Sequence, residues 1–270
     1  MSGEMSYSSF ERGCVDGETE KRREKILVAI ATYNEIDNVP RLTERLLSLL
    51  PDADVLIVDD NSPDGTGAWV QKAGERDSRV KALVRQNERG LGSAVICALK
   101  YAIEHDYDAV VNMDADFSHP VEYAPRLIAR LNQKNAEVDV VIGSRYVPGG
   151  ATPDWPLKRR LMSRCVNTFA RITLGLKTRD NSGAFRCYRV SVLRKLNFDG
   201  FVSTGYSFFE ETLYRLRLVG ARFAEIPIVF IDRRMGVSKI NRKEAIKAVA
   251  IMLRLGVKRI FSKTSLGSNR

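Results

Sequence analysis

The stretch Val110-Val111-Asn112-Met113-Asp114-Ala115-Asp116 decides the fold class of this chain. Its apolar first part, bounded by turn-forming residues, predicts a buried β-strand. Pro120 lacks a backbone donor and disfavours helix before it, so the strand ends here and places its two acids at the carboxyl edge. Ligands bind at that edge in open α/β sheets. The stretch therefore predicts a candidate site at the edge of an α/β sheet.

Asp114 and Asp116 are separated by one residue, so in a continuing strand both side chains point to the same face. Two neighbouring carboxylates repel each other and are costly to bury unpaired, which suits a hard divalent cation such as Mg²⁺ or Mn²⁺. A strand-end turn with two solvated acids gives the same short pattern. The motif alone leaves both interpretations open.

The first half of the chain alternates candidate strands with candidate helices. Apolar runs predict strands at 26–30, 55–58, 80–84, 110–113 and 138–142, and helical spacing predicts helices at 40–50, after 66, at 91–104 and around 127–131. Repeated strand–helix units imply a mostly parallel, Rossmann-like sheet flanked by helices. That architecture alone fixes no chemistry.

Length and composition bound the class of protein. The 270 residues, 44% hydrophobic and 28% charged, can bury one large α/β core or two small ones. No apolar run reaches about 18 residues, so we expect no spanning helix. Residues 1–24 lack the apolar segment of a secretory signal and are expected to form a flexible tail. The four scattered cysteines form no paired metal spacing and indicate reduced thiols in a cytosolic setting.

The net charge of +10 is concentrated in two segments. Residues 158–171 carry five Lys or Arg and no acid, and residues 233–259 carry nine Lys or Arg and one acid. Such segments suit nucleic acid, an anionic membrane surface or phosphate-bearing substrates. Because no aromatic RNA-binding motif or zinc module accompanies them, we expect no nucleic-acid partner, and a nucleic-acid-binding protein is the remote alternative.

Two familiar motifs match only in part. Gly90-Leu91-Gly92 begins like a dinucleotide fingerprint, but the third glycine position holds Val95. The segment 60–65 begins like a calcium-binding loop, but its twelfth position is Gln71. We interpret that segment as a turn, and whether Asp59 or Asp60 contacts a ligand stays open.

Several motifs in order resemble the family-2 glycosyltransferases of the GT-A fold, and among them the dolichol-phosphate (polyprenol-phosphate) mannosyltransferases. The resemblance runs from about Ile26 to Lys258. It is carried by Thr32-Tyr33-Asn34-Glu35, the segment 59–66, Asp114-Ala115-Asp116, Ser118-His119-Pro120, Gly143-Ser144-Arg145-Tyr146, Leu157-Lys158-Arg159-Arg160, Ser182-Gly183-Ala184-Phe185-Arg186 and Gly236-Val237-Ser238-Lys239. It implies a catalytic domain at 25–232, a phosphate-binding loop and amphipathic helix at 233–262, and a flexible tail at 263–270.

The resemblance also implies a role for individual residues. The nucleotide-sugar donor would be bound by Ala31, Tyr33, Glu35, Val58, Asp60, Asp114, Ala115, Asp116, Arg145, Arg233 and Lys239. The acceptor phosphate would be bound by Arg145, Arg159 and Ser163, and the metal by Asp114, Asp116 and Ser118. The residues expected to support catalysis directly are Asp116, Arg145, Arg159 and Arg233.

The sequence departs from the family pattern at three of these positions. Ala31 replaces a proline that usually precedes the Thr-Tyr-Asn-Glu motif, and Val237 replaces a glutamate near the phosphates. Ser118 stands where some relatives have a glutamine metal ligand. A serine hydroxyl is shorter, so a water molecule could take its place as a ligand.

Two segments have the pattern of amphipathic helices. Near 157–174, Arg159 and Ser163 lie four residues apart and could bind one phosphate. On other faces of this helix we expect a polar stripe of Arg160, Arg164, Asn167 and Arg171 and an apolar stripe of Leu161, Cys165, Phe169 and Ile172. In the C-terminal segment one face carries Ile246, Val249, Ala250, Leu253, Val257, Ile260 and Phe261, with Lys247, Arg254 and Lys258 beside it. Such a helix either packs on the protein core or lies in a lipid headgroup layer.

The resemblance implies a metal-dependent, inverting sugar transfer from a nucleotide-sugar, most simply GDP-mannose, to polyprenyl or dolichyl phosphate. A phosphate monoester has a second pKa of about 6, so it is largely dianionic at neutral pH and needs no general base. The protein would then act peripherally on the cytoplasmic face of a membrane. The same fold with a UDP-sugar donor, or with a hydroxyl acceptor, is the alternative.

Overall fold

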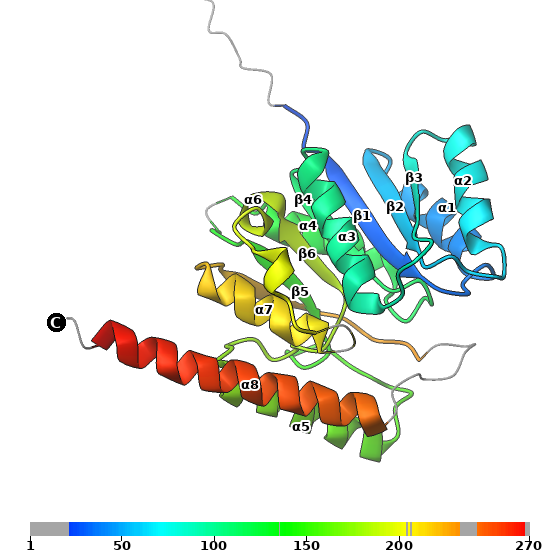
Figure 1. Ribbon diagram of the computed structural model, residues 1–270. Coiled ribbons are helices and arrows are strands. Elements are labelled where there is room, and N and C mark those ends of the chain that lie inside the picture. Colours follow the sequence, from blue (N-terminus) through cyan, green and yellow to red (C-terminus); the bar gives the residue numbers. More distant parts are fainter. Residues whose placement is uncertain (1–21, 135, 204, 206, 233–241, 268–270) are drawn as a thin grey trace, which may run out of the picture.

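The computed structural model describes residues 22–134, 136–203, 205, 207–232 and 242–267 and confirms the expected α/β fold. One sheet has the strand order β3-β2-β1-β4-β6-β5-β7 (Figure 1). The strands are β1 (Ile26–Thr32), β2 (Ala53–Asp59), β3 (Val80–Val84), β4 (Ala109–Met113), β5 (Val140–Ser144), β6 (Arg186–Arg189) and β7 (Phe223–Pro227). All neighbouring pairs are parallel except those of β6, which runs antiparallel between β4 and β5.

The helices follow the expected order. They are α1 (Val39–Leu49), α2 (Thr66–Arg76), α3 (Leu91–Glu104), α4 (Ala124–Leu131), α5 (Leu157–Leu174), α6 (Val190–Leu193), α7 (Phe208–Leu218) and α8 (Arg242–Gly267), with short 3-10 turns at Val121–Tyr123 and Phe198–Gly200. Helix α8 continues past residue 262, where we expected a tail to begin. Residues 1–21 of the expected N-terminal tail lie outside the described residues.

The sheet separates two hydrophobic cores because its central strands are apolar on both faces. On β1, Leu27 and Ala29 contribute to the core beneath α3 and α7. Val28 and Ile30 contribute to the core beneath α1 and α4. A strand buried on both faces reads as a continuous apolar run, which is why these strands were recognisable from the sequence.

Helices α5 and α8 lie side by side, apart from the helices α1 and α2 (Figure 1). Gly256 of α8 allows the close approach, because a Cβ there would lie 2.5 Å from Cγ2 of Thr173. Arg259 Nη1 donates to the carbonyl oxygens of Ile172 and Thr173, at 2.9 and 3.0 Å. The carbonyls at the carboxyl end of α5 thereby gain a cationic partner.

Asn167 corrects our expectation for α5. We placed it on one polar stripe with three arginines, but the structure buries it at 3% exposure, on the inner face of the helix with Ala170 and Leu174. Its side-chain oxygen accepts hydrogen bonds from the backbone N of Asn181 and of Ser182, and so holds the loop before β6. Leu161 and Ile172 of the expected apolar stripe are exposed.

Helix α7 buries a carboxyl group. Glu210 is 4% exposed, and its Oε2 has no hydrogen-bond partner within the described residues. Burial raises the pKa of Glu210 from 4.5 to about 7, against the lowering effect of Arg186 and Arg145. The folded protein therefore binds this proton more tightly than the unfolded chain does.

We expect Glu210 to make stability depend on pH. A raised folded-state pKa contributes stability that is fully present below about pH 4.5 and is lost as the pH rises through about 7. Glu210→Gln keeps the shape of the side chain but does not titrate. Urea denaturation at a series of pH values should show the variant gaining stability over the wild type across this window. Glu44→Gln, at an exposed position of α1, is the control, and a pH-independent difference for Glu210→Gln would contradict the assignment.

Candidate active site

The carboxyl ends of the parallel strands bring the expected site loops to one edge of the sheet. The register pairs Thr32 of β1 with Asp59 of β2, and Ile30 of β1 with Met113 of β4. The loops that follow β1, β2 and β4 therefore lie next to one another. Each loop begins where its strand ends, so the sequence motifs that these loops carry all lie at the carboxyl edge of the sheet.

The turn after β2 is held by Asp59. This buried carboxylate accepts hydrogen bonds from Thr32 Oγ1 at 2.8 Å, and from the backbone N and Oγ of Ser62 at 2.8 and 2.6 Å. Gly65, in the left-handed region at φ +91°, leads this turn into α2. The turn interpretation of Asp59 is thus the one that the structure supports.

Asp60 has a buried cationic partner. Its Oδ1 accepts from Arg85, with Nε at 2.8 Å and with a short contact from Nη2. Its Oδ2 accepts from the backbone N of Gly90 at 2.8 Å. The expected donor-binding carboxylate is therefore oriented by the end of β3 and the start of α3. The ring of Tyr33, another expected donor residue, has the guanidinium of Arg89 5.0 Å from its centroid.

The other expected donor residues lie along the same edge. Val58 is fully buried within β2, and Ala31, near the end of β1, packs against the same core. Glu35 Oε2 accepts from Asn38 Nδ2 at 2.8 Å at the start of α1. Arg233 and Lys239 lie outside the described residues.

The loop after β4 presents Asp114 and Asp116. Asp116 Oδ1 accepts from the backbone N of Ser118 at 3.0 Å, which closes a tight turn across Phe117, a residue in the left-handed region at φ 59°. The side chain of Asp114 is 39% exposed and lies 3.7 Å from Nδ1 of His119. Ala115 between the two acids is buried. The turn thus keeps both carboxylates at the carboxyl edge of the sheet, directly after β4.

His119 supports this loop from below. Its Nδ1 accepts from the backbone N of Asp114 at 3.3 Å, and its ring stacks on Phe185 and meets the edge of Phe230. Burial lowers the pKa of His119 despite the nearby Asp114 and Asp116. The imidazole is therefore a neutral packing residue whose Nδ1 accepts the hydrogen bond from Asp114.

The donor atoms at this loop suit a hard cation. Ser118 is 2% exposed, and its buried Oγ has no hydrogen-bond partner in the part of the chain that the structure describes. Two carboxylates and one hydroxyl form an all-oxygen set, which Mg²⁺ and Mn²⁺ prefer. Within the described residues, no group of three or more His, Cys, Asp or Glu forms a metal cluster. A cation held here would thus share its coordination with a phosphate-bearing ligand or water.

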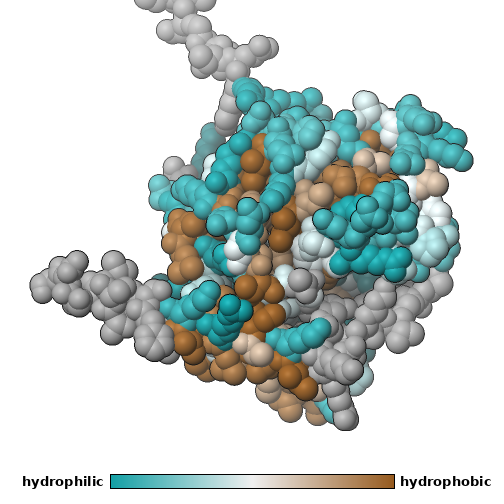
Figure 2. All heavy atoms as spheres, in the orientation of Figure 1, coloured by the Kyte–Doolittle hydropathy of each residue, from teal (hydrophilic) through white to brown (hydrophobic). Residues whose placement is uncertain are grey.

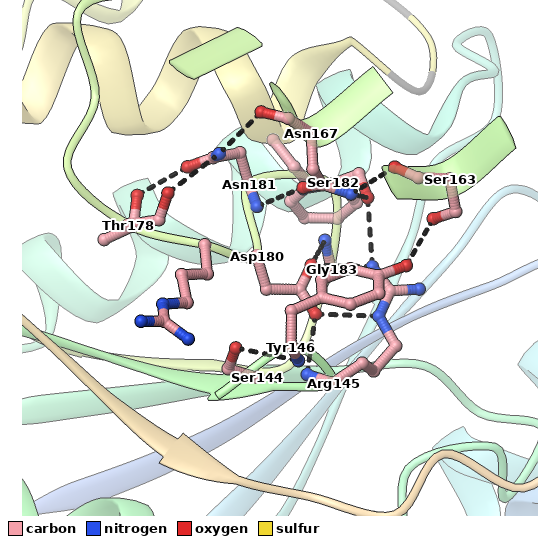
Figure 3. A network of polar contacts seen from close by, with 12 residues as sticks. Ser144, Arg145, Tyr146, Ser163, Asn167, Thr178, Asp180, Asn181, Ser182 and Gly183 are labelled. Atoms are coloured by element: carbon pink, nitrogen blue, oxygen red, sulfur yellow. Dashed lines mark hydrogen bonds and ion pairs between the residues drawn. The ribbon is translucent and has the colours of Figure 1, made fainter. Parts of the chain in front are cut away.

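Arg145 follows β5 and forms a buried ion pair with Asp180. Nε and Nη2 each donate to the carboxylate at 2.7 Å, and the backbone N of Arg145 donates to Oδ2 at 2.9 Å (Figure 3). Burial alone would lower the pKa of Arg145 and raise that of Asp180, but their mutual attraction outweighs it in both cases. Both groups are therefore charged, and the Nε and Nη2 edge of the guanidinium is hydrogen-bonded to Asp180.

Arg159 and Ser163 occupy one face of α5, as expected. Arg159 Nη1 donates to Asp232 at 2.7 Å, and its guanidinium lies 4.1 Å from the ring centroid of Trp155. Arg145 lies 5.4 Å from a Trp155 ring centroid as well. The two arginines expected to bind the acceptor phosphate are thus brought together against one indole.

Sequence reasoning missed four residues of this neighbourhood, Tyr146, Trp155, Asp180 and Asp232. Tyr146 was within a quoted motif but was assigned no role. Asp180 lies two residues before the quoted Ser182 motif, and only its place opposite Arg145 in the fold reveals its function. Trp155 lies just before the first basic segment and Asp232 just before the second. The excess of Lys and Arg in these segments was the only sequence feature that pointed to this region.

The face formed by α5 and α8 opposite this site is apolar and basic. Leu157 and Ile172 of α5 are 78% and 73% exposed, and Ile246 of α8 is 70% exposed. Hydrophobic side chains gather along this side of the molecule (Figure 2). The exposed members are Leu157, Leu161, Met162 and Ile172 of α5 and Ile246, Val249, Leu253 and Val257 of α8. We call this set the α5/α8 face. The expected residues Ile260 and Phe261 have no described side chains.

Helix α8 also packs on the core, through other residues. Met252 and Leu255 are buried in the core shared with α3 and α7. Lys247, Arg254 and Lys258 are exposed beside the apolar residues. One side of α8 therefore packs on the core, and its other side presents exposed apolar and basic residues. No described helix combines the length and the hydropathy needed to cross a bilayer.

Comparison with known proteins assigns the family. The family model described as glycosyl transferase family 2 matches residues 27–197. The chain is 40% identical over 233 residues to the undecaprenyl-phosphate mannosyltransferase of Micrococcus luteus, covering 86% of this chain and 94% of the relative. It is 38% identical over 239 residues to the polyprenol monophosphomannose synthase of Mycolicibacterium smegmatis, covering 87% and 89%.

Solved structures agree on the fold. Glucosyl-3-phosphoglycerate synthase from Mycobacterium tuberculosis, in complex with Mn²⁺, UDP-glucose and phosphoglyceric acid, superposes with a TM-score of 0.62 at 18% identity, covering 86% of this chain and 80% of the other. A second structure of that enzyme, with UDP, gives a TM-score of 0.61 at 17% identity over 86% and 80% of the chains. The sheet and its flanking helices are thus of the GT-A type. Together with the sequence matches, this shows that the chain belongs to glycosyltransferase family 2.

Proposed function

We propose that this enzyme transfers mannose from GDP-mannose to the phosphate of a polyprenyl or dolichyl lipid, with inversion at the sugar and with Mg²⁺ or Mn²⁺ as cofactor. One observation carries the proposal. Asp114 and Asp116 follow β4 and Arg145 follows β5 at one edge of the sheet, and Trp155 lies between Arg145 and Arg159 of α5, a helix whose outer face with α8 is apolar and basic. The names of the two relatives, both of which refer to polyprenyl mannose chemistry, support the same substrate class.

The acceptor side is suited to an anion that is its own nucleophile. A phosphate monoester is largely dianionic above pH of about 6, so no side chain has to remove a proton. Arg159 has three features that favour phosphate binding: it is partly exposed, oriented by Asp232 and stacked on Trp155. Its hydrogen bond to Asp232 uses Nη1. A planar guanidinium oriented in this way binds phosphate oxygens with two parallel donors.

The donor side is suited to a nucleoside diphosphate. The fixed carboxylate of Asp60 and the ring of Tyr33 would contact the nucleoside, and Asp114 and Asp116 would hold the cation. That cation would neutralise the charge that develops on the departing diphosphate. Arg145 keeps a positive charge between the two halves of the site, which lowers the repulsion between two anionic substrates. Attack from the acceptor side on the anomeric carbon then inverts its configuration.

The α5/α8 face gives the protein a way to reach a lipid acceptor. Each Lys or Arg near an anionic leaflet contributes about 1 kcal/mol, and salt screens this contribution. Inserted apolar area contributes roughly 25 cal/mol per Å². We therefore propose that the enzyme lies on the cytoplasmic surface of a membrane with α5 and α8 in the headgroup layer.

A panel of nucleotide-sugars with radiolabelled sugar tests the proposed reaction. Polyprenyl phosphate and Mn²⁺ are supplied, and lipid-soluble product is measured. We expect GDP-mannose to give the product and UDP-glucose to give little. Transfer from a UDP-sugar alone would contradict GDP-mannose as the donor. Transfer to a hydroxyl group would contradict a phosphate as the acceptor.

We expect Asp116→Asn to lower kcat by about two orders of magnitude or more, because the loop loses one of its two carboxylates. EDTA should inhibit the wild type, and Mn²⁺ should restore its activity. Calorimetry should show Mn²⁺ affinity in the presence of GDP reduced in the variant. Asp199→Asn, at a side chain 90% exposed, is the matched control. Full activity of the chelated enzyme would refute the metal assignment.

We expect the protein to co-sediment with liposomes that contain anionic lipid, and to be released by high salt. Leu253→Asp and Val257→Asp place a charge on the α5/α8 face and should weaken binding several-fold. Leu49→Asp, at a 37% exposed position on α1, should leave binding unchanged. If the wild type ignores anionic vesicles at low salt, the α5/α8 face has another partner.

A further inference from the structure

Two hydroxyl groups meet where the sheet edge touches α5. Tyr146, directly after Arg145, donates from Oη to Oγ of Ser163 at 2.6 Å (Figure 3). A phenol is a stronger acid than an aliphatic alcohol, so Tyr146 is the donor in this pair. Ser163 then keeps its own hydrogen for another acceptor. Within the described residues, the Ser163 hydroxyl has no second hydrogen-bond partner.

Tyr146 is held in place by the end of β5. Its backbone N donates to Ser144 Oγ at 3.3 Å, and the guanidinium of Arg145 lies 5.4 Å from its ring centroid. Burial raises the pKa of Tyr146, and this outweighs the lowering effect of Arg145 and of the hydrogen bond to Ser163. The phenol therefore remains a neutral donor over the whole pH range in which the enzyme would work.

A residue other than Tyr146 also anchors α5. Asn167 does this, because its Oδ1 accepts from the backbone N of Asn181 at 2.6 Å and its Nδ2 donates to Ser182 Oγ at 3.1 Å. Met252 and Leu255 of α8 add buried apolar contacts in the core next to the same helix. The hydrogen bond between Tyr146 and Ser163, at the partly buried end of these contacts, has a different consequence. It fixes the direction of the Ser163 O–H.

We propose that Tyr146 is a positioning residue for the acceptor phosphate: its hydroxyl orients Ser163, whose own O–H then donates to a phosphate oxygen beside Arg159. This inference rests on the proposed function and extends it to a residue that does not itself touch the substrate. Donation from Tyr146 polarises the Ser163 hydroxyl, and hydrogen bonds in such a chain strengthen one another. Arg159, one helical turn away on the same face, supplies the charge.

Tyr146→Phe removes a single oxygen atom and tests the inference. The probe is farnesyl phosphate, with binding measured by calorimetry without a sugar donor and KM measured in the transfer assay. We expect affinity for farnesyl phosphate to fall about tenfold, because Ser163 is no longer oriented to donate its hydrogen bond to the charged phosphate. The KM for the sugar donor should stay unchanged. Ser163→Ala should have a similar effect, and Tyr146→Phe should add little in the Ser163→Ala background.

Tyr101→Phe on α3 is the control, since it also removes a phenol oxygen, away from the acceptor residues. Unchanged binding of farnesyl phosphate to Tyr146→Phe would overturn the inference, and so would effects of the two substitutions that simply add. An equal rise in the KM of donor and acceptor would indicate general loosening and would also overturn it. Binding of farnesyl phosphate by the wild type without sugar transfer would count against the proposed reaction while leaving the Tyr146 inference intact.

Discussion

The buried ion pair of Arg145 and Asp180 is the interaction on which the rest of the site depends. Removing two charges from water is costly, and the cost is offset only by close geometry and additional hydrogen bonds. Here the carboxylate accepts three bonds from Arg145, and the guanidinium also reaches Ser182 Oγ at 2.9 Å. Glu225 of β7 holds the same loop through the backbone N of Asp180 at 3.0 Å. Loss of either charge would leave the other buried without a partner.

This pair connects the two halves of the site. Arg145 extends the strand β5 at the sheet edge, and the loop that carries Asp180 is bound to α5 through Asn167. The position of α5 therefore depends on the same contacts that hold a positive charge near Asp114. The reaction that we propose would gain from this coupling, because the cation between two anionic substrates would keep a fixed distance from the helix proposed to bind one of them.

The sequence predicted the structure well where a residue pattern is typical of a single kind of element. Buried strands read as apolar runs, and Asp114 and Asp116 follow one of them, so their place at the carboxyl edge was predictable. Strand β6 was not, because its four residues include the fully buried Arg186, whose Nη1 and Nη2 donate to the carbonyls of Phe209 and Asn181. Pairs such as Asp60 with Arg85 and Asp180 with Arg145 were also hidden. Their partners lie 25 and 35 residues away, and only the folded sheet shows which cation each carboxylate meets.

Helix α5 explains how one element can serve both a charged site and a lipid surface. Arg159 and Ser163 lie on its inner side, and Leu161 and Met162 are exposed on another. An α-helix with its side chains is about 10–12 Å across. An interfacial helix buries its apolar face roughly 5–10 Å into the boundary between headgroups and acyl chains. In the membrane position that we propose, with Leu161 and Met162 at that boundary, the inner face of α5 would lie at the depth of the lipid phosphates. The acceptor phosphate could then meet Arg159 and Ser163 while its polyprenyl chain remains in the bilayer.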